Sequence, residues 1–353
     1  MNFPGSPVAL LLFSLVGCAP PPQPPQPTEH DRRLGEWQKL DSKLAETHTQ
    51  FVSAAAGYEK AMSDFQKGLI KTMAEQKPTS RLAKQTLQKS RDQVAPLVAE
   101  RERVGGDLAK AFDALVAARG RRGQAILALM RAEAQLTELE ARTLGSKAQR
   151  EQGLDKERAE LESVLGQLEA QQRARSEALH ALLKKEVEIV SVGSDVKKRD
   201  QADQELDQLH DQLDKSLGSQ LETERALAVA TASLHQRALV LVPTGPKREL
   251  LAQRVAARTG LVNEFLAAEE ALKGAISDRA SQTKQRIGFE SEIDHLVEIG
   301  LTVQVKAHVL EALGSETAAV AQARTAMQAQ DLAASEHEGQ LLALEVTLHR
   351  LAM

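Results

Sequence analysis

The stretch that decides the fold runs from Trp37 to Phe65 and reads WQKLDSKLAETHTQFVSAAAGYEKAMSDF. Within it, an apolar side chain recurs every seventh residue, at Trp37, Leu44, Phe51, Tyr58 and Phe65. Positions seven apart lie on one side of an α-helix, so these side chains form one stripe. Aromatic residues make up only 3% of the chain, and the stripe gathers several of them. We interpret it as a helix-packing seam rather than a ligand groove.

The composition extends this interpretation to the whole chain. Ala, Leu, Glu, Lys and Arg together supply about half of the 353 residues, a share typical of long helices and coiled coils. A compact α/β enzyme or a β-sandwich is disfavoured, because aromatic side chains usually dominate such cores. Twelve prolines are present, and only four of them follow residue 27, so the body of the chain has few helix breakers.

Proline and glycine positions divide this body into expected helices. The first runs from about Glu29 to Gln76 and ends near Pro78. The second is capped by Thr79 or Ser80 and reaches about Leu144. Pro96 and the pair Gly105-Gly106 lie inside it and predict a kink or a short break.

A third segment extends from Lys147 to Leu241 after a turn at Leu144-Gly145-Ser146, and Ser146 with Gln149 matches a capping box. It carries two leucine seams with helical spacing. The first seam consists of Leu161, Leu165, Leu168, Leu179 and Leu182, and the second of Leu206, Leu209, Leu213, Leu217 and Leu221. Val192-Gly193-Ser194-Asp195 is a candidate break between them. Unbroken, the segment would be about 140 Å long.

Pro243-Thr244-Gly245-Pro246 is the clearest break in the body. A fourth helix from Lys247 to about Ile299 and a fifth from Leu301 to His349 follow it, the latter with a candidate interruption at Leu313-Gly314-Ser315. Helices this long must pack side by side. The sequence therefore predicts an all-α, elongated antiparallel helical bundle or coiled coil of about five long helices, with residues 29–242 as its main part and residues 247–353 as a helical pair packed on the same bundle.

The amino-terminal segment has a different character. Residues 8–16 form an apolar run that is too short to span a membrane and suits the core of a signal peptide, although no Lys or Arg precedes it. The run ends in Leu15-Val16-Gly17-Cys18, which resembles the lipobox of bacterial lipoproteins. Six prolines crowd residues 20–27, a composition typical of an extended, semi-rigid spacer.

The resemblance to bacterial lipoproteins implies a lipid modification and a location in the cell. Residues 1–17 would be a signal peptide, and residues 18–28 a lipidated, proline-rich linker. Cys18 would carry diacylglycerol on its thiol and a further acyl chain, such as palmitate, on its amino group, and several chains on one residue anchor a protein stably. Ala19 stands where lipoproteins kept at the inner membrane often carry Asp, so the resemblance favours the outer membrane of the cell envelope, with the body facing the periplasm.

Charge and chemistry exclude several classes. The net charge of −4 gives no basic half, so nucleic acid is not an expected partner, and the single cysteine allows neither an intrachain disulfide nor a cysteine metal cluster.

Acid–histidine pairs three residues apart occur at Glu177/His180, Asp207/His210 and Glu292/His295. This is the ligand spacing of di-iron bundles, but the pairs miss or merely flank the apolar seams. No phosphate loop, zinc motif or nucleophile elbow is present, so we expect no metal, no cofactor and no enzyme activity.

Three functions remain as hypotheses. The first is an outer-membrane-anchored lipoprotein with a structural, scaffolding or protein-interaction role, which binds other envelope proteins or itself through its coiled coil. It resembles murein lipoprotein only in its anchor and coiled-coil plan, and a membrane-shaping dimer similar to a BAR domain is a variant. The second is a helical component of an envelope transport assembly, similar to efflux factors. The third is a helical-bundle pore-forming toxin.

Overall fold

The computed structural model describes residues 28–78, 80–144, 147–191, 196–301 and 303–352. Nearly all of these residues are helical, and no strand occurs among them, so the expected all-α fold is confirmed. The helices within these ranges are α1 (Glu29–Glu75), α2 (Arg81–Thr143), α3 (Lys147–Ser191), α4 (Val196–Leu241), α5 (Pro246–Gly300), α6 (Val303–Ala312) and α7 (Gly314–Leu351).

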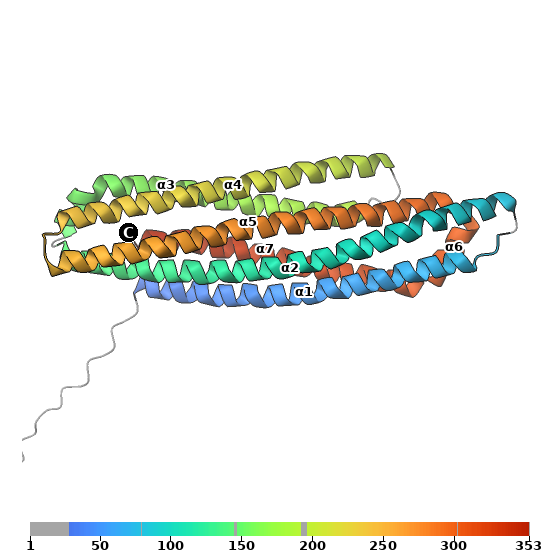
Figure 1. Cartoon of the computed structure of the whole chain (residues 1–353), viewed down its shortest axis with the longest axis horizontal. Helices are drawn as coiled ribbons and strands as arrows, with labels where there is room; N and C mark the ends of the chain where they lie inside the picture. The colour runs from blue at the N-terminus through green and yellow to red at the C-terminus, as the bar shows by residue number, and fades with distance from the viewer. Residues whose placement is uncertain (1–27, 79, 145–146, 192–195, 302, 353) are drawn as a thin grey trace, which may run out of the picture.

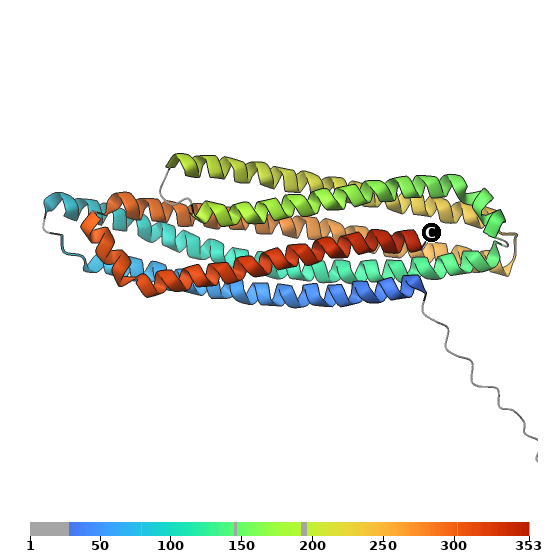
Figure 2. The same ribbon diagram turned by 180° about the vertical axis from the view of Figure 1, so that it is seen from behind.

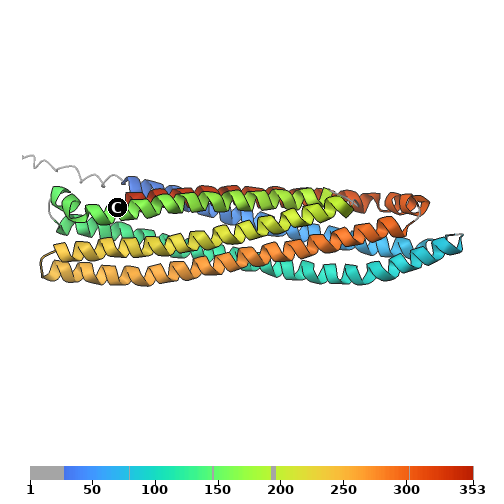
Figure 3. The ribbon, with the colours of Figure 1, turned by 90° about the horizontal axis from the view of Figure 1, so that it is seen from above.

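Six of the helices lie side by side in two rows of three. One row consists of α2, α5 and α4, which face the viewer in Figure 1, and the other of α1, α7 and α3, which face the viewer in Figure 2. Figure 3 shows both rows from above. The most extensive contacts join α2 to α5, α1 to α7, and α3 to α4. Helix α2 alone has 63 residues, so the bundle is a rod of about 95 Å.

Two of the five expected helices are each divided. The expected third segment is the antiparallel hairpin of α3 and α4, and the candidate break at residues 192–195 lies outside the described residues. The expected fifth helix consists of the short α6 and the long α7, which meet at the predicted interruption near Leu313. In a hairpin, the leucine seam of α3 and the leucine seam of α4 pack against each other. In a single unbroken helix the two seams could not meet.

Of the kink or short break expected in the second helix, the break is absent, because α2 runs continuously through Pro96 and Gly105-Gly106. Packing along most of its length against α5 supports the helix at these positions. Gly105 instead permits a close approach, since a Cβ atom there would collide with the Glu59 carboxylate of α1. The glycine therefore allows α1 and α2 to pack closely, and it does not mark a turn.

Local sequence sets the helix ends. The side-chain hydroxyl of Thr28 accepts a hydrogen bond from the Asp31 backbone, and the Asp31 carboxylate bonds back to Thr28, which completes a capping box for α1. The Ser80 hydroxyl accepts a hydrogen bond from the Ala83 backbone and caps α2, so of the two expected caps, Thr79 or Ser80, it is Ser80 that lies at the N-cap. Gly245 has a φ of 147°, which favours glycine, and Pro246 then begins α5. The capping box expected at Ser146 lies outside the described residues.

The predicted seams form much of the core. Trp37, Leu44, Phe51 and Tyr58 are buried, and Phe65 is half-buried, so the stripe is a packing seam of α1. Both leucine seams of α3 and α4 are also buried, with Leu209 partly so. Each of these seams packs against neighbouring helices at a different position along the rod. The hydrophobic core is therefore elongated rather than gathered in one compact centre.

Candidate functional site

The interior of the rod contains an unusual number of charged side chains, and α7 organises them. Arg324, Asp331, Glu338 and Glu345 follow one another at intervals of seven residues, and we call these four the α7 charged heptad. Their side-chain exposure is 24%, 22%, 9% and 3%, so they become more deeply buried toward the carboxyl end of the helix. Each of them meets oppositely charged or polar side chains from other helices.

Arg324 belongs to a group centred on Tyr58. The Tyr58 hydroxyl donates a hydrogen bond to Glu290 Oε2 at 2.8 Å and accepts one from Arg324 Nη2 at 3.1 Å. Arg101 Nη2 donates to Glu290 Oε1 at 2.6 Å. The guanidinium carbons of Arg101, Arg286 and Arg324 lie 5.8, 4.9 and 5.4 Å from the centre of the tyrosine ring. Cations at these distances are attracted to an aromatic ring, so this group joins α1, α2, α5 and α7.

Asp331 shares one guanidinium with a second acid. Arg279 of α5 pairs with Asp331 and also with Glu186 of α3, whose Oε2 lies 3.1 Å from Arg279 Nη2. Burial raises the pKa of Glu186 to about 7, because the single guanidinium only partly offsets it and Asp331 adds a second negative charge. Glu186 therefore titrates near neutral pH within the interior.

Glu338 has the opposite arrangement, with two guanidinium groups on one carboxylate. It pairs with Arg119 of α2 and with Arg175 of α3. Burial alone would raise the pKa of Glu338, but these two cations outweigh it and lower that pKa to about 2. Burial and the Arg119 charge lower the pKa of His48 to about 3, so His48 is neutral and its Nε2 accepts a hydrogen bond from Arg119 Nη1 at 2.5 Å.

Glu345 receives the most regular ion pair. Arg122 of α2 donates from Nη1 and Nη2 to the two oxygens of Glu345, both at 2.6 Å. The Trp37 indole nitrogen donates to Glu345 Oε1 at 3.2 Å. Arg122 also pairs with Glu269 of α5, and its guanidinium lies 5.7 Å from the centre of the Phe265 ring. A bidentate pair of this kind fixes the geometry of both side chains.

Two more buried groups continue the pattern toward the end of the rod where α4 meets α5. Glu133 of α2 accepts hydrogen bonds from Arg258 Nε and Nη2 at 3.0 and 2.6 Å and lies 3.0 Å from His349 Nδ1. Burial opposes ionisation, but His349 and Arg258 lower the pKa of Glu133 to about 2. Glu140 lies 2.7 Å from His235 Nδ1 of α4.

These groups join side chains of different helices across the interior of the rod. A buried ion pair gives little net stability, because desolvation offsets the attraction, but breaking one partner is costly. Each carboxylate of the α7 charged heptad pairs with an arginine from another helix, so a one-turn slip of α7 would separate several pairs at once. We infer that the heptad specifies how the rows align.

The residues singled out from the sequence are not brought together. Cys18 lies outside the described residues. Glu177 and His180 line a groove of about 760 Å³ between α3 and α7, whereas Asp207 pairs with Lys284 on α5. His210 lies on α4, and the pair Glu292/His295 lies on α5. Among the described residues, no three His, Cys, Asp or Glu side chains are grouped in a way that could hold a metal ion.

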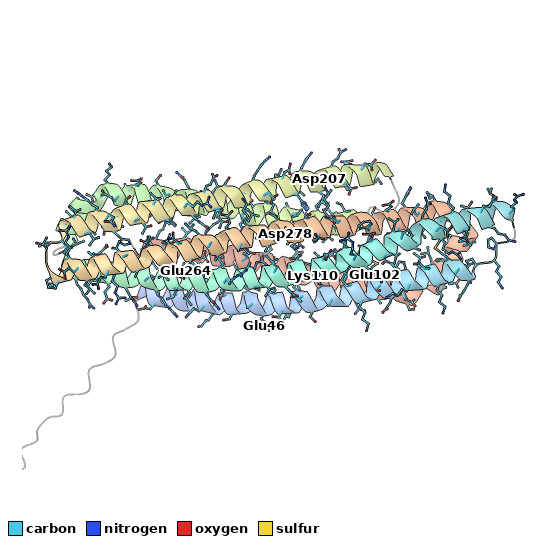
Figure 4. All side chains as sticks on the ribbon, in the orientation of Figure 1. Glu46, Glu102, Lys110, Asp207, Glu264 and Asp278 are labelled. Carbon is cyan, nitrogen blue, oxygen red and sulfur yellow. The ribbon has the colours of Figure 1, made fainter. Side chains whose placement is uncertain are left out.

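The outer faces of the rod are strongly charged. Figure 4 labels six charged side chains on α1, α2, α4 and α5, namely Glu46, Glu102, Lys110, Asp207, Glu264 and Asp278. Many of these charges pair locally, as Lys110 does with Asp107 at 2.9 Å. Within the described ranges, no helix combines the length and the apolar character that a membrane span requires.

No protein-family model matches the chain, and neither a curated protein nor a solved structure shows significant similarity to it.

Proposed function

We propose that the chain is a non-catalytic lipoprotein of the outer membrane, in which a lipid on Cys18 anchors a rigid helical rod that spaces or binds other envelope proteins. The observation that carries the proposal is the sequence Leu15-Val16-Gly17-Cys18 after an apolar run and before a proline-rich spacer. The capped start of α1 at Glu29 follows this spacer directly.

The form of the rod supports a mechanical role. Helix α1 begins toward the same end as the α4–α5 connection, whereas the α1–α2 connection and α6 lie at the opposite end (Figure 1). An anchor at Cys18 would therefore hold one end near the membrane and leave the other end on the order of 95 Å away. The buried ion pairs between helices resist bending and slipping of the rod. The exposed charged faces would be available to partners in the envelope.

The anchor is tested by metabolic labelling of bacterial cells with an alkyne-bearing fatty acid. The wild-type chain should be labelled and should fractionate with the outer membrane, and Cys18→Ala should lose both properties. Gly17→Ala is the matched control, because it keeps a small residue before the cysteine, and it should behave as the wild type. Ala19→Asp should move the labelled protein to the inner membrane. Equal labelling of the wild type and Cys18→Ala would refute the anchor.

The interaction role needs a separate experiment. A photo-crosslinking amino acid is placed at Leu82, which is 73% exposed near the α1–α2 end, or at Val240, which is 63% exposed near the α4–α5 end. We expect reproducible adducts with defined envelope proteins in intact cells, and a different set from each end. The absence of adducts from both ends of the anchored protein would count against a scaffolding role.

A further inference from the structure

A cavity of about 270 Å³ lies where α1, α5 and α7 meet, with α3 and α6 at its edges. Much of its wall is apolar and is formed by Met62, Phe65, Ile189, Ile287, Ile293 and Val320. An apolar protein cavity of about 150 Å³ accepts benzene, so this one has room for about eleven non-hydrogen atoms. It is large enough for a small organic molecule and too small for a peptide.

One polar group in the wall has an unmet hydrogen bond. Gln66 of α1 is 1% exposed and lines the cavity. Its side-chain oxygen Oε1 finds no hydrogen-bond partner among the described residues. A buried acceptor without a donor is unfavourable, and a ligand that brings an N–H or O–H group would satisfy it.

A solvent-exposed carboxylate at the mouth also lacks a direct ion pair. Asp294 lines the cavity and makes no hydrogen bond or ion pair with any other described residue. Partial burial and the neighbouring Glu290 carboxylate raise the pKa of Asp294 to about 6 against the opposing charge of Arg324, so Asp294 is still mostly ionised above pH 7. Glu290 itself is already satisfied, because it bonds to Arg101 at 2.6 Å and to Tyr58 at 2.8 Å.

The cation in the wall is less available than these acceptors. Arg324 donates to the Tyr58 hydroxyl at 3.1 Å and lies 3.9 Å from Glu290. An anionic ligand would have to compete with these contacts and approach the Asp294 carboxylate as well. The unpartnered Gln66 oxygen and the Asp294 carboxylate therefore favour a ligand that donates hydrogen bonds over an anionic one.

We propose that this cavity binds an amphipathic primary ammonium compound. The ammonium group lies beside Asp294 and donates a hydrogen bond to Gln66, and an aliphatic chain of about eight carbons covers the apolar wall. The ligand class follows from the unpartnered Gln66 oxygen, from the Asp294 carboxylate, which has no direct ion pair, and from the size of the cavity. This binding function is separate from the spacing role and does not depend on it.

The test uses calorimetric titration of the full-length chain carrying Cys18→Ala, so that no acyl chain competes for the cavity. The probes at pH 8 are octylammonium, octanoate and octanol, each below its micelle-forming concentration. We expect octylammonium to bind at least tenfold more tightly than either of the other two. Methyl NMR signals of Met62 and of the isoleucines in the wall should shift on binding, because the chain contacts them.

Variants locate the site. Asp294→Asn should weaken octylammonium binding at least tenfold and leave octanol binding unchanged. Glu292→Gln removes an exposed carboxylate on the same helix outside the cavity wall and should alter the affinity less than twofold. Ala321→Trp places a large ring at the exposed mouth and should abolish binding. Circular dichroism confirms that each variant is folded.

Several results would overturn the proposal. These are the absence of octylammonium binding at millimolar concentration, octanoate binding as tight as that of octylammonium, and an affinity unchanged by Asp294→Asn in the folded protein. Shifts confined to methyl groups outside the wall would overturn it as well.

Discussion

Replacing Glu338 by glutamine tests whether the α7 charged heptad depends on charge rather than on shape. The substitution keeps the size of the side chain and removes the negative charge that Arg119 and Arg175 share. Both guanidinium groups lie in the interior, and no other carboxylate forms an ion pair with either of them among the described contacts. Glu338→Gln would therefore leave two interior guanidinium groups without a direct ion-pair partner.

The magnitude follows from the pKa of Glu338, which is lowered from 4.5 to about 2. A lowered pKa means that ionised Glu338 stabilises the folded chain, and a shift of this size corresponds to about 3 kcal/mol at pH 7. Breaking a buried pair typically costs about 3–5 kcal/mol, which agrees. The stabilisation is complete above pH 4.5 and is lost as the pH falls toward 2. It should be about half as large at pH 3.

The assay is urea unfolding followed by circular dichroism, at pH 7 and again at pH 3. At pH 7, Glu338→Gln should lower the free energy of unfolding by about 3 kcal/mol, and the difference from the wild type should shrink at pH 3. Glu336→Gln, an exposed site on the same helix, is the control and should change it by less than about 0.5 kcal/mol. Equal stability of the two variants at pH 7, or a loss for Glu338→Gln that is the same at both pH values, would refute the reasoning.

Three further substitutions act by other physical causes. Glu186→Gln should stabilise the chain at pH 8 by up to about 3 kcal/mol and have little effect at pH 4.5, because the raised pKa of Glu186 makes its ionisation in the folded chain unfavourable. Arg279 keeps its pair with Asp331 in this variant. Urea unfolding at both pH values measures the effect. Gly166→Ala, at an exposed helical site where the Cβ meets no neighbour, should raise the free energy of unfolding by about 1 kcal/mol, and an unchanged or lower value would contradict it. Ser80→Ala removes the cap of α2 and should cost about 1 kcal/mol, seen as faster hydrogen exchange confined to the first turn of that helix.

The sequence predicts the helices well because their seams are regular. The stripe from Trp37 to Phe65 and the leucine seams lie against neighbouring helices as expected, and the break around Gly245 separates α4 from α5. Of the kink or short break expected at Pro96 and Gly105-Gly106, the break is absent, because contacts with α5 support α2. Local propensity alone cannot include such tertiary support.

The buried charges were missed, although a signal was present. Two interleaved heptads run along α7, one charged and one apolar, and both face the interior. The apolar heptad consists of Met327, Ala334, Leu341 and Leu348, all of them buried. The charged heptad has the same spacing three residues earlier, so its burial could have been predicted from the period alone. Its partners could not, because they depend on which helices become neighbours in the two rows. Cys18 and the lipid anchor stay a prediction.

The α7 charged heptad also affects what the helix does before the bundle is complete. A long helix with a purely apolar seam pairs readily with other coiled coils, because leucine seams discriminate poorly between partners. Arg324, Asp331, Glu338 and Glu345 place a charge in every heptad of the α7 seam. Pairing with a foreign leucine seam would bury these charges without counter-ions, at a cost of several kcal/mol. Such foreign pairings are therefore disfavoured relative to packing of α7 against its own arginines on α2, α3 and α5.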